Sequence, residues 1–149
     1  SYAHRTLLAY IGVRIFLDAN VISETLRRNP DKQVMTWLAV HDQELAIPTV
    51  TIAEIAYGIA RIRPDQRSLL LMEGLDAWRG RFAGRIFPFT EQAALIYGDL
   101  MGKASLAGAA LSAPDGMIAA ITLANRGRLA TRNTRDFQGL ELINPWERR

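Results

Sequence analysis

Short runs of hydrophobic residues alternate along this chain with longer segments in which hydrophobic residues recur at helical spacing. Short runs rich in β-branched residues and closed by Asp, Pro or Asn predict buried strands, and periodic segments preceded by Ser, Thr or Asn predict capped helices. The predicted strands are 13–17, 45–47, 85–88, 128–131 and 140–143. The predicted helical segments, counted from their capping or first residues, are 20–28, 31–40, 51–62, 64–78, 90–106 and 112–124.

This alternation of strands and helices predicts the fold class. Strands joined by helices form a parallel sheet that is covered on both faces, so we expect an α/β fold with three layers, α/β/α, around a central, mainly parallel sheet. A chain of 149 residues fits one domain. Residues 1–13 are interpreted as an amino-terminal extension that need not belong to the fold, and residues 14–149 as the domain itself.

Four acidic residues fall where such a sheet builds its sites. Asp18 directly follows the first strand, and Asp136 lies in the loop after strand 128–131. Glu54 and Asp115 are expected in the first turns of helices, with Glu54 three residues after the predicted cap Thr51 in the form of a capping box. Ligands of parallel sheets bind at the carboxyl ends of strands, so the four acids are expected to lie together.

Clustered carboxylates indicate a metal site and a phosphate chemistry. Acids brought together repel one another, so they take up protons unless a cation neutralises them. Hard divalent cations such as Mg²⁺ or Mn²⁺ suit an all-oxygen cluster. A metal held in this way activates water and stabilises the charge that develops on a phosphate. The arginines that flank the site in sequence, among them Arg132 and Arg135, could hold neighbouring RNA phosphates.

Each acid also has an alternative role. Glu54 and Asp115 could only complement helix dipoles or complete a cap. Asp18 is harder to explain in this way, because a carboxylate at the end of a buried strand must be hydrogen-bonded, paired or metal-bound. A phosphatase with Asp18 as nucleophile is a further alternative, but such enzymes usually carry a second acid two residues on, where this chain has Asn20.

The composition narrows the function only slightly. The chain has no cysteine, which excludes disulfides, thiolate metal sites and cysteine nucleophiles and fits a cytoplasmic location. Sixteen of its 18 basic residues are arginine, which suits phosphate binding but equally fits a genome rich in G and C. No run approaches the roughly 20 apolar residues needed to span a bilayer, so no membrane association is expected.

Four segments surround the candidate acids: IFLDANVISE at 15–24, TIAEIAYG at 51–58, SAPDGMIAA at 112–120, and LATRNTRDF at 129–137 followed by INPW at 143–146. These motifs resemble those of PIN-domain ribonucleases of the VapC and FitB toxin type. They occur in the order and at the spacing of that family, and the similarity runs from about residue 14 to residue 146.

The resemblance implies a metal-dependent endoribonuclease that is the toxin of a VapBC-type toxin–antitoxin pair. It further implies dependence on Mg²⁺ or Mn²⁺, a homodimer, and a small VapB-like antitoxin that blocks the active site. By motif position, Asp18 and Asp115 are the firmest metal ligands and Glu54 supports them. The fourth position is open between Asp136, which we favour, and Asn133.

Two further expectations follow from the resemblance. Asn20, Thr131 and Asn133 are expected to be supporting polar neighbours of the acids. The alternative function is a PIN-like module that binds nucleic acid or a partner without catalysis, in which the acids only organise the fold. The complete set of acids argues against that alternative, since an inactive site would be expected to have lost one of them.

Overall fold

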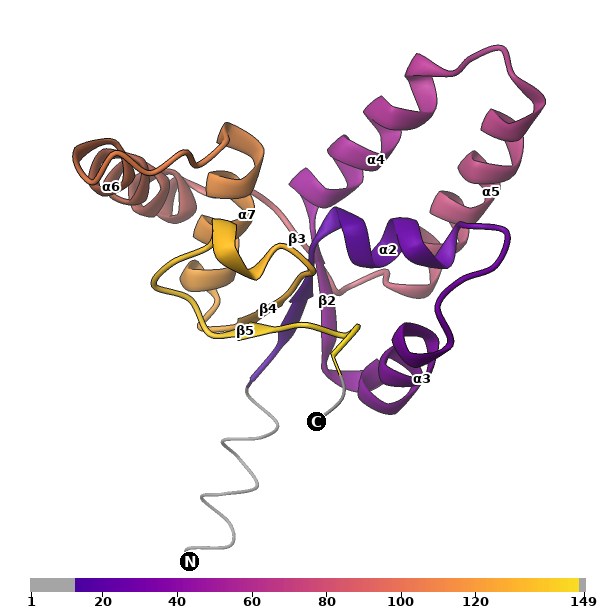
Figure 1. Cartoon of the computed structure of the whole chain (residues 1–149), viewed down its shortest axis with the longest axis horizontal. Coiled ribbons are helices and arrows are strands. Elements are labelled where there is room, and N and C mark those ends of the chain that lie inside the picture. The colour runs from indigo at the N-terminus through magenta and orange to yellow at the C-terminus, as the bar shows by residue number, and fades with distance from the viewer. Residues whose placement is uncertain (1–12, 148–149) are drawn as a thin grey trace, which may run out of the picture.

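The computed structural model describes residues 13–147 and contains one five-stranded parallel sheet between two layers of helices (Figure 1). The strands are β1 Ile15–Leu17, β2 Leu45–Pro48, β3 Ile86–Phe87, β4 Arg128–Ala130 and β5 Leu142–Ile143. The helices are α2 Ala19–Thr25, α3 Lys32–His41, α4 Thr49–Arg61, α5 Gln66–Arg81, α6 Glu91–Leu106 and α7 Ala113–Ala124. Two short 3₁₀ turns, η1 Asp42–Glu44 and η2 Thr134–Asp136, complete the elements.

The sheet places β1 at its centre. The strand order is β3-β2-β1-β4-β5, and every pair is parallel. Ile15 lies opposite Leu45 on one side and Arg128 on the other, and Leu17 lies opposite Ala130. The ends of β1 and β4 are therefore level, so the residues that follow these two strands come together at the same edge of the sheet.

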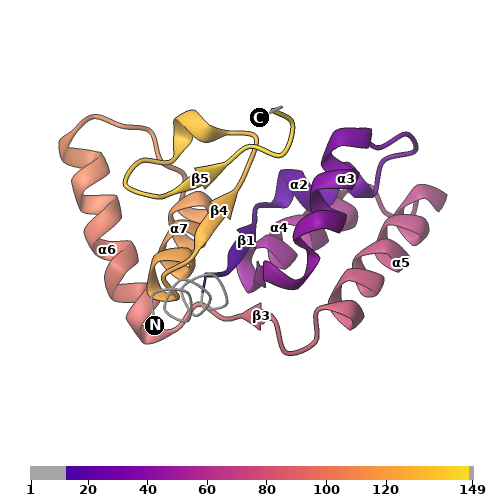
Figure 2. The same ribbon diagram turned by 90° about the horizontal axis from the view of Figure 1, so that it is seen from below.

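Alternation along β1 divides the core between the two faces of the sheet. Ile15 and Leu17 point to one face and pack with residues of α2, α3, α4 and α5, whereas Phe16 points to the other face and packs with α6 and α7. Figure 2 shows this separation, with α6 and α7 on one side of the strands and the other helices opposite. All three side chains have no exposed surface, which explains why the strand is apolar throughout.

The predicted three-layer α/β/α fold is confirmed, and so is each predicted strand and helix, with bounds shifted by a few residues. Two predicted helix caps are wrong. Asp18, not Asn20, caps α2, and its carboxylate accepts a hydrogen bond from the backbone N–H of Ala19. Helix α4 begins at Thr49 and has no side-chain cap, so Thr51 does not form a capping box with Glu54.

Within the described residues, no helix is both long enough and apolar enough to cross a membrane.

The predicted extension, residues 1–13, lies outside the described residues apart from Val13, and the proposed division of the chain at residue 13 stays a prediction.

Gly127, which leads into β4, permits a close approach that any side chain would prevent. A Cβ at this position would lie 2.6 Å from two ring carbons of the buried Phe16 and 3.0 Å from the carbonyl oxygen of Arg14. We expect Gly127→Ala to lower the free energy of unfolding by about 1–3 kcal/mol, because the backbone oxygen and the packed ring can move little.

Urea unfolding followed by circular dichroism measures this loss. Gly98→Ala is the matched control, since a Cβ at this position in α6 meets nothing within 4 Å. This control should raise stability by about 0.5–1 kcal/mol through helix propensity. Equal stability of the two variants would contradict the proposed role of the close approach.

Candidate functional site

Asp18 is the anchor of the site and is only 4 % exposed. It follows β1 directly, and its backbone N–H donates to the carbonyl oxygen of Ala130 at 3.0 Å, which continues the pairing of β1 with β4. One carboxylate oxygen accepts from the Ala19 N–H at 2.8 Å, and the other accepts from the Thr131 hydroxyl at 2.7 Å. A carboxylate at the end of a buried strand thus has the hydrogen bonds that its burial requires.

A polar network joins Asp18 to the loop after β4. The side-chain amide of Asn20 donates to the Asp18 carboxylate and to the Thr131 hydroxyl, both at 3.3 Å. The Thr131 hydroxyl also accepts from the backbone N–H of Asn133 at 3.0 Å, and the Asn20 carbonyl oxygen accepts from the backbone N–H of Arg132 at 3.3 Å. These contacts fix the two segments against each other at the carboxyl edge of the sheet.

Glu54 reaches the same edge from the second turn of α4, not from the first turn as predicted. The helix is tied to the sheet by Thr51, which is fully buried and donates its hydroxyl to the carbonyl oxygen of Leu17 at 2.8 Å. One carboxylate oxygen of Glu54, Oε1, is buried and has no hydrogen-bond partner in the described part of the chain. An unpartnered buried carboxylate oxygen is costly unless a ligand such as a cation completes it.

Asp115 enters from the opposite layer, in the first turn of α7. The Ser112 side chain caps this helix, as predicted, and accepts from the Asp115 N–H at 3.3 Å. The carboxylate therefore lies at the positive end of a helix dipole, which favours its charged form.

The structure brings three carboxylates from three elements together. Asp18, Glu54 and Asp115 each offer an oxygen, and these atoms all lie within 4.8 Å of one another. The three residues fit a divalent cation, because they supply only hard oxygen donors and because Glu54 has a buried carboxylate oxygen with no hydrogen-bond partner in the described part of the chain. These three residues could hold Mg²⁺ or Mn²⁺, with oxygen atoms of water or substrate completing the coordination of the cation.

Burial and the proximity of other acids raise the pKa values of the three carboxylates. The pKa of Glu54 rises from 4.5 to about 7, first because burial desolvates the carboxylate and then because Asp18 and Asp115 repel its negative charge. Burial is also the main cause of the raised pKa of Asp18, against the opposing hydrogen bond from Thr131, and of the raised pKa of Asp115. Without a cation the cluster is therefore under electrostatic strain.

The remaining predicted residues lie around the cluster rather than in it. Asp136 is exposed on the 3₁₀ turn η2 and lies outside the group of three, yet its charge contributes to the raised pKa values of Asp18 and Asp115. Asn133 is exposed, and its backbone contacts Thr131. Arg135 lines a different cavity together with Asp136, whereas Arg132 lines a groove beside Glu54.

Comparison with known proteins agrees with this geometry. The PIN domain family matches residues 15–141, which is most of the chain. The chain belongs to the PIN domain family. This confirms the resemblance seen in the four motifs of this PIN domain.

Two relatives and one solved structure are similar over nearly their whole length. The PIN domain is 37 % identical over 137 residues to the VapC ribonuclease Y4jK of Sinorhizobium fredii, covering 89 % of this chain and 98 % of the relative. It is 36 % identical over 136 residues to the toxin FitB of Neisseria gonorrhoeae, with the same coverage. The crystal structure of FitAcB from Neisseria gonorrhoeae superimposes with a TM-score of 0.81 at 36 % identity, covering 89 % of this chain and 98 % of that one.

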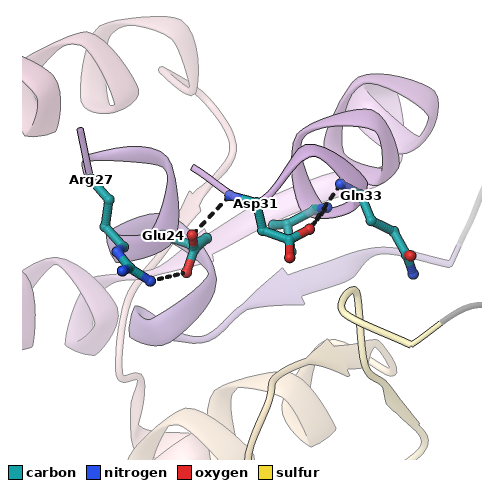
Figure 3. Close-up of polar contacts among 5 residues, drawn as sticks. Glu24, Arg27, Asp31 and Gln33 are labelled. Atoms are coloured by element: carbon teal, nitrogen blue, oxygen red, sulfur yellow. Dashed lines mark hydrogen bonds and ion pairs between the residues drawn. The ribbon is translucent and has the colours of Figure 1, made fainter. Parts of the chain in front are cut away.

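Two structural features near the site escaped the sequence interpretation. Local sequence favours a capping role for Thr51, because Ser and Thr commonly begin helices. Only the packing of α4 on β1 reveals the hydrogen bond from the Thr51 hydroxyl to the carbonyl oxygen of Leu17. Glu24 is 5 % exposed, and its carboxylate accepts from the backbone N–H of Asp31 at 2.9 Å and pairs with Arg27 at 3.3 Å (Figure 3).

The raised pKa of Glu54 predicts a pH dependence of stability in metal-free protein. The folded chain holds this proton up to about pH 7, whereas the unfolded chain releases it near pH 4.5, so the folded state binds more protons between these values. The free energy of unfolding should therefore fall by roughly 1–3 kcal/mol as the pH rises from 5 to 8, partly reduced by solvent screening. Urea unfolding in EDTA at several pH values measures this slope.

Glu54→Gln should flatten that slope, and Mn²⁺ should restore stability to the unmodified chain at pH 8 by neutralising the cluster. Glu73→Gln, at an exposed position on α5, is the matched control and should leave the slope unchanged. If the free energy of unfolding depends on pH in the same way in the Glu54 and Glu73 variants, the pH dependence does not come from the carboxylate cluster.

Proposed function

We propose that this chain is an endoribonuclease that hydrolyses RNA phosphodiester bonds with the help of Mg²⁺ or Mn²⁺. The single observation that carries the proposal is the convergence of Asp18, Glu54 and Asp115, each of which offers a carboxylate oxygen within 4.8 Å of the others. The identity of 37 % to a protein named a VapC ribonuclease supports RNA as the substrate. An inactive binding module would have no need to maintain such a strained cluster.

Asp18, Glu54 and Asp115 are the residues that would hold the cation. When bound, it would supply the charge that lets an anionic substrate approach and would lower the pKa of a water molecule for attack on phosphorus. Asn20 and Thr131 act as positioning residues, because their hydrogen bonds fix the direction of the Asp18 carboxylate.

Asp136 is proposed as the fourth acidic residue of the site. It is exposed on the turn η2, and its charge contributes to the raised pKa values of Asp18 and Asp115, which supports a place for it beside the cluster. Asn133 is the competing candidate, and its backbone bond to Thr131 places it at the start of the same turn.

The biological role we propose is that of a toxin held in check by a small antitoxin. This chain is 36 % identical to a protein named toxin FitB, and the family resemblance of its motifs implies a VapB-like partner that blocks the active site. We further propose a homodimer that acts in the cytoplasm. Large apolar side chains exposed on α4 and α6, Tyr57 and Leu95 at 66 % and 73 %, offer surface for such self-association.

Replacing either central aspartate should abolish cleavage. Asp18→Asn and Asp115→Asn each remove a charge that would hold the cation, so cleavage of RNA should fall by about 100-fold or more. Cleavage of a labelled single-stranded RNA in Mn²⁺ measures the loss, and EDTA should stop the reaction of the unmodified chain.

The matched control is Asp76→Asn, an acid exposed on α5 whose only described partner is Arg79. This control should cleave like the unmodified chain. Strong cleavage by both site variants would refute the proposed centre, whereas no cleavage by the unmodified chain, together with no Mn²⁺ binding, would favour the non-catalytic binding module.

A further inference from the structure

A groove of about 480 Å³ opens beside the carboxylate cluster, between α2, α4 and α5. Glu54 of the cluster and Asn20, which contacts Asp18, both belong to its lining, so the groove is continuous with the site. The rest of its wall is largely apolar and is formed by Leu26, Ile55, Ile59, Leu71 and Trp146.

Three arginines line this groove, and two of them carry uncompensated charge. Arg27 pairs with the buried Glu24, whose second oxygen is taken by the Asp31 N–H, as Figure 3 shows. Arg67 and Arg132, in contrast, have no carboxylate partner within residues 13–147. Two free guanidinium groups over an apolar wall make a surface that attracts anions carrying an apolar or aromatic part.

Arg132 is held in a defined position. Its guanidinium carbon lies 5.0 Å from the centroid of the Trp146 ring, and its backbone N–H donates to Asn20. The backbone of Trp146 is fixed in turn, because its backbone N–H donates to the Asn144 side-chain oxygen at 3.0 Å and its carbonyl oxygen accepts from the side-chain amide of Gln33 at 3.1 Å. The stacked pair is therefore pre-organised next to the carboxylates before any ligand arrives.

We propose that this groove binds one nucleotide of a single-stranded RNA next to the bond that is cut. The Arg132–Trp146 pair supplies the stacking surface for its base, and Arg67 and Arg132 bind the flanking phosphates. Unstacked bases of single strands pack on aromatic rings and guanidinium planes, and arginine binds phosphate with two donors. The volume lies within the range of about 300–1,000 Å³ of small-molecule pockets. This inference rests on the proposed ribonuclease function and names its substrate subsite.

The test measures RNA binding apart from cleavage. Asp115→Asn serves as the parent so that the RNA stays intact, and the probe is a fluorescein-labelled single-stranded RNA about 12 nucleotides long in Mn²⁺. Adding Arg132→Ala or Arg67→Ala should weaken binding about 10-fold, as measured by fluorescence anisotropy. Each should also reduce the slope of log affinity against log salt by about 1.

Arg132→Lys separates charge from stacking. It should keep the salt slope of the parent but bind less tightly, because an ammonium group cannot replace the planar guanidinium on Trp146. Arg79→Ala is the matched control, since it removes the same charge from α5 outside the groove and breaks only an exposed ion pair. Its affinity should stay within about two-fold of the parent.

Binding by the Arg67 and Arg132 variants equal to that of the Arg79 control would overturn the proposal. Failure of the parent to bind the RNA would also overturn it. If the unmodified chain does not cleave RNA but the groove variants weaken binding as expected, the ribonuclease proposal fails and the nucleotide subsite stands. Thermal unfolding of each variant confirms that it is folded, and Arg67, exposed on α5, provides a variant away from the packed Trp146.

Discussion

Burial of three neighbouring carboxylates is the constraint on which the organisation of this PIN domain depends. Asp18, Glu54 and Asp115 lie within reach of one cation, and burial, together with the charges of neighbouring acids, raises all three pKa values. Such an arrangement is stable only if the scaffold fixes each acid independently. The chain achieves this by placing them on three different elements, at the end of β1, in α4 and at the start of α7.

Burial of apolar side chains around the sheet offsets the unfavourable electrostatic energy of the carboxylate cluster. Fully buried side chains on both faces of β1 lock the strand between two helical layers, so the residue that follows it cannot move away from the cluster. Hydrogen bonds then set direction: Thr131, directly after β4, orients the Asp18 carboxylate, and Thr51 ties α4 to the carbonyl oxygen of Leu17. Packing and polar contacts therefore have separate roles, one in holding position and the other in orientation.

Residues of opposite charge surround the cluster. Asp136 adds negative potential at the carboxylates, whereas Arg132 lies over the Trp146 ring and lines an apolar groove that Arg67 also lines. The proposed cation and RNA strand would require opposite potentials at neighbouring positions, and these side chains are of the corresponding signs. Arg132 and Arg135 line different cavities, although they are only three residues apart in sequence.

The sequence by itself determined the fold class and the candidate acids, because strand and helix periodicity and the four motifs are local properties of the chain. Asp18 was identifiable since a charge that ends a buried strand requires partners. Tertiary structure alone decided that Glu54 approaches from the second turn of its helix, that Thr51 bonds to β1 instead of capping, and that Arg132 rather than Arg135 lies beside Glu54. These outcomes depend on contacts between residues far apart in sequence, on which local propensity has no bearing.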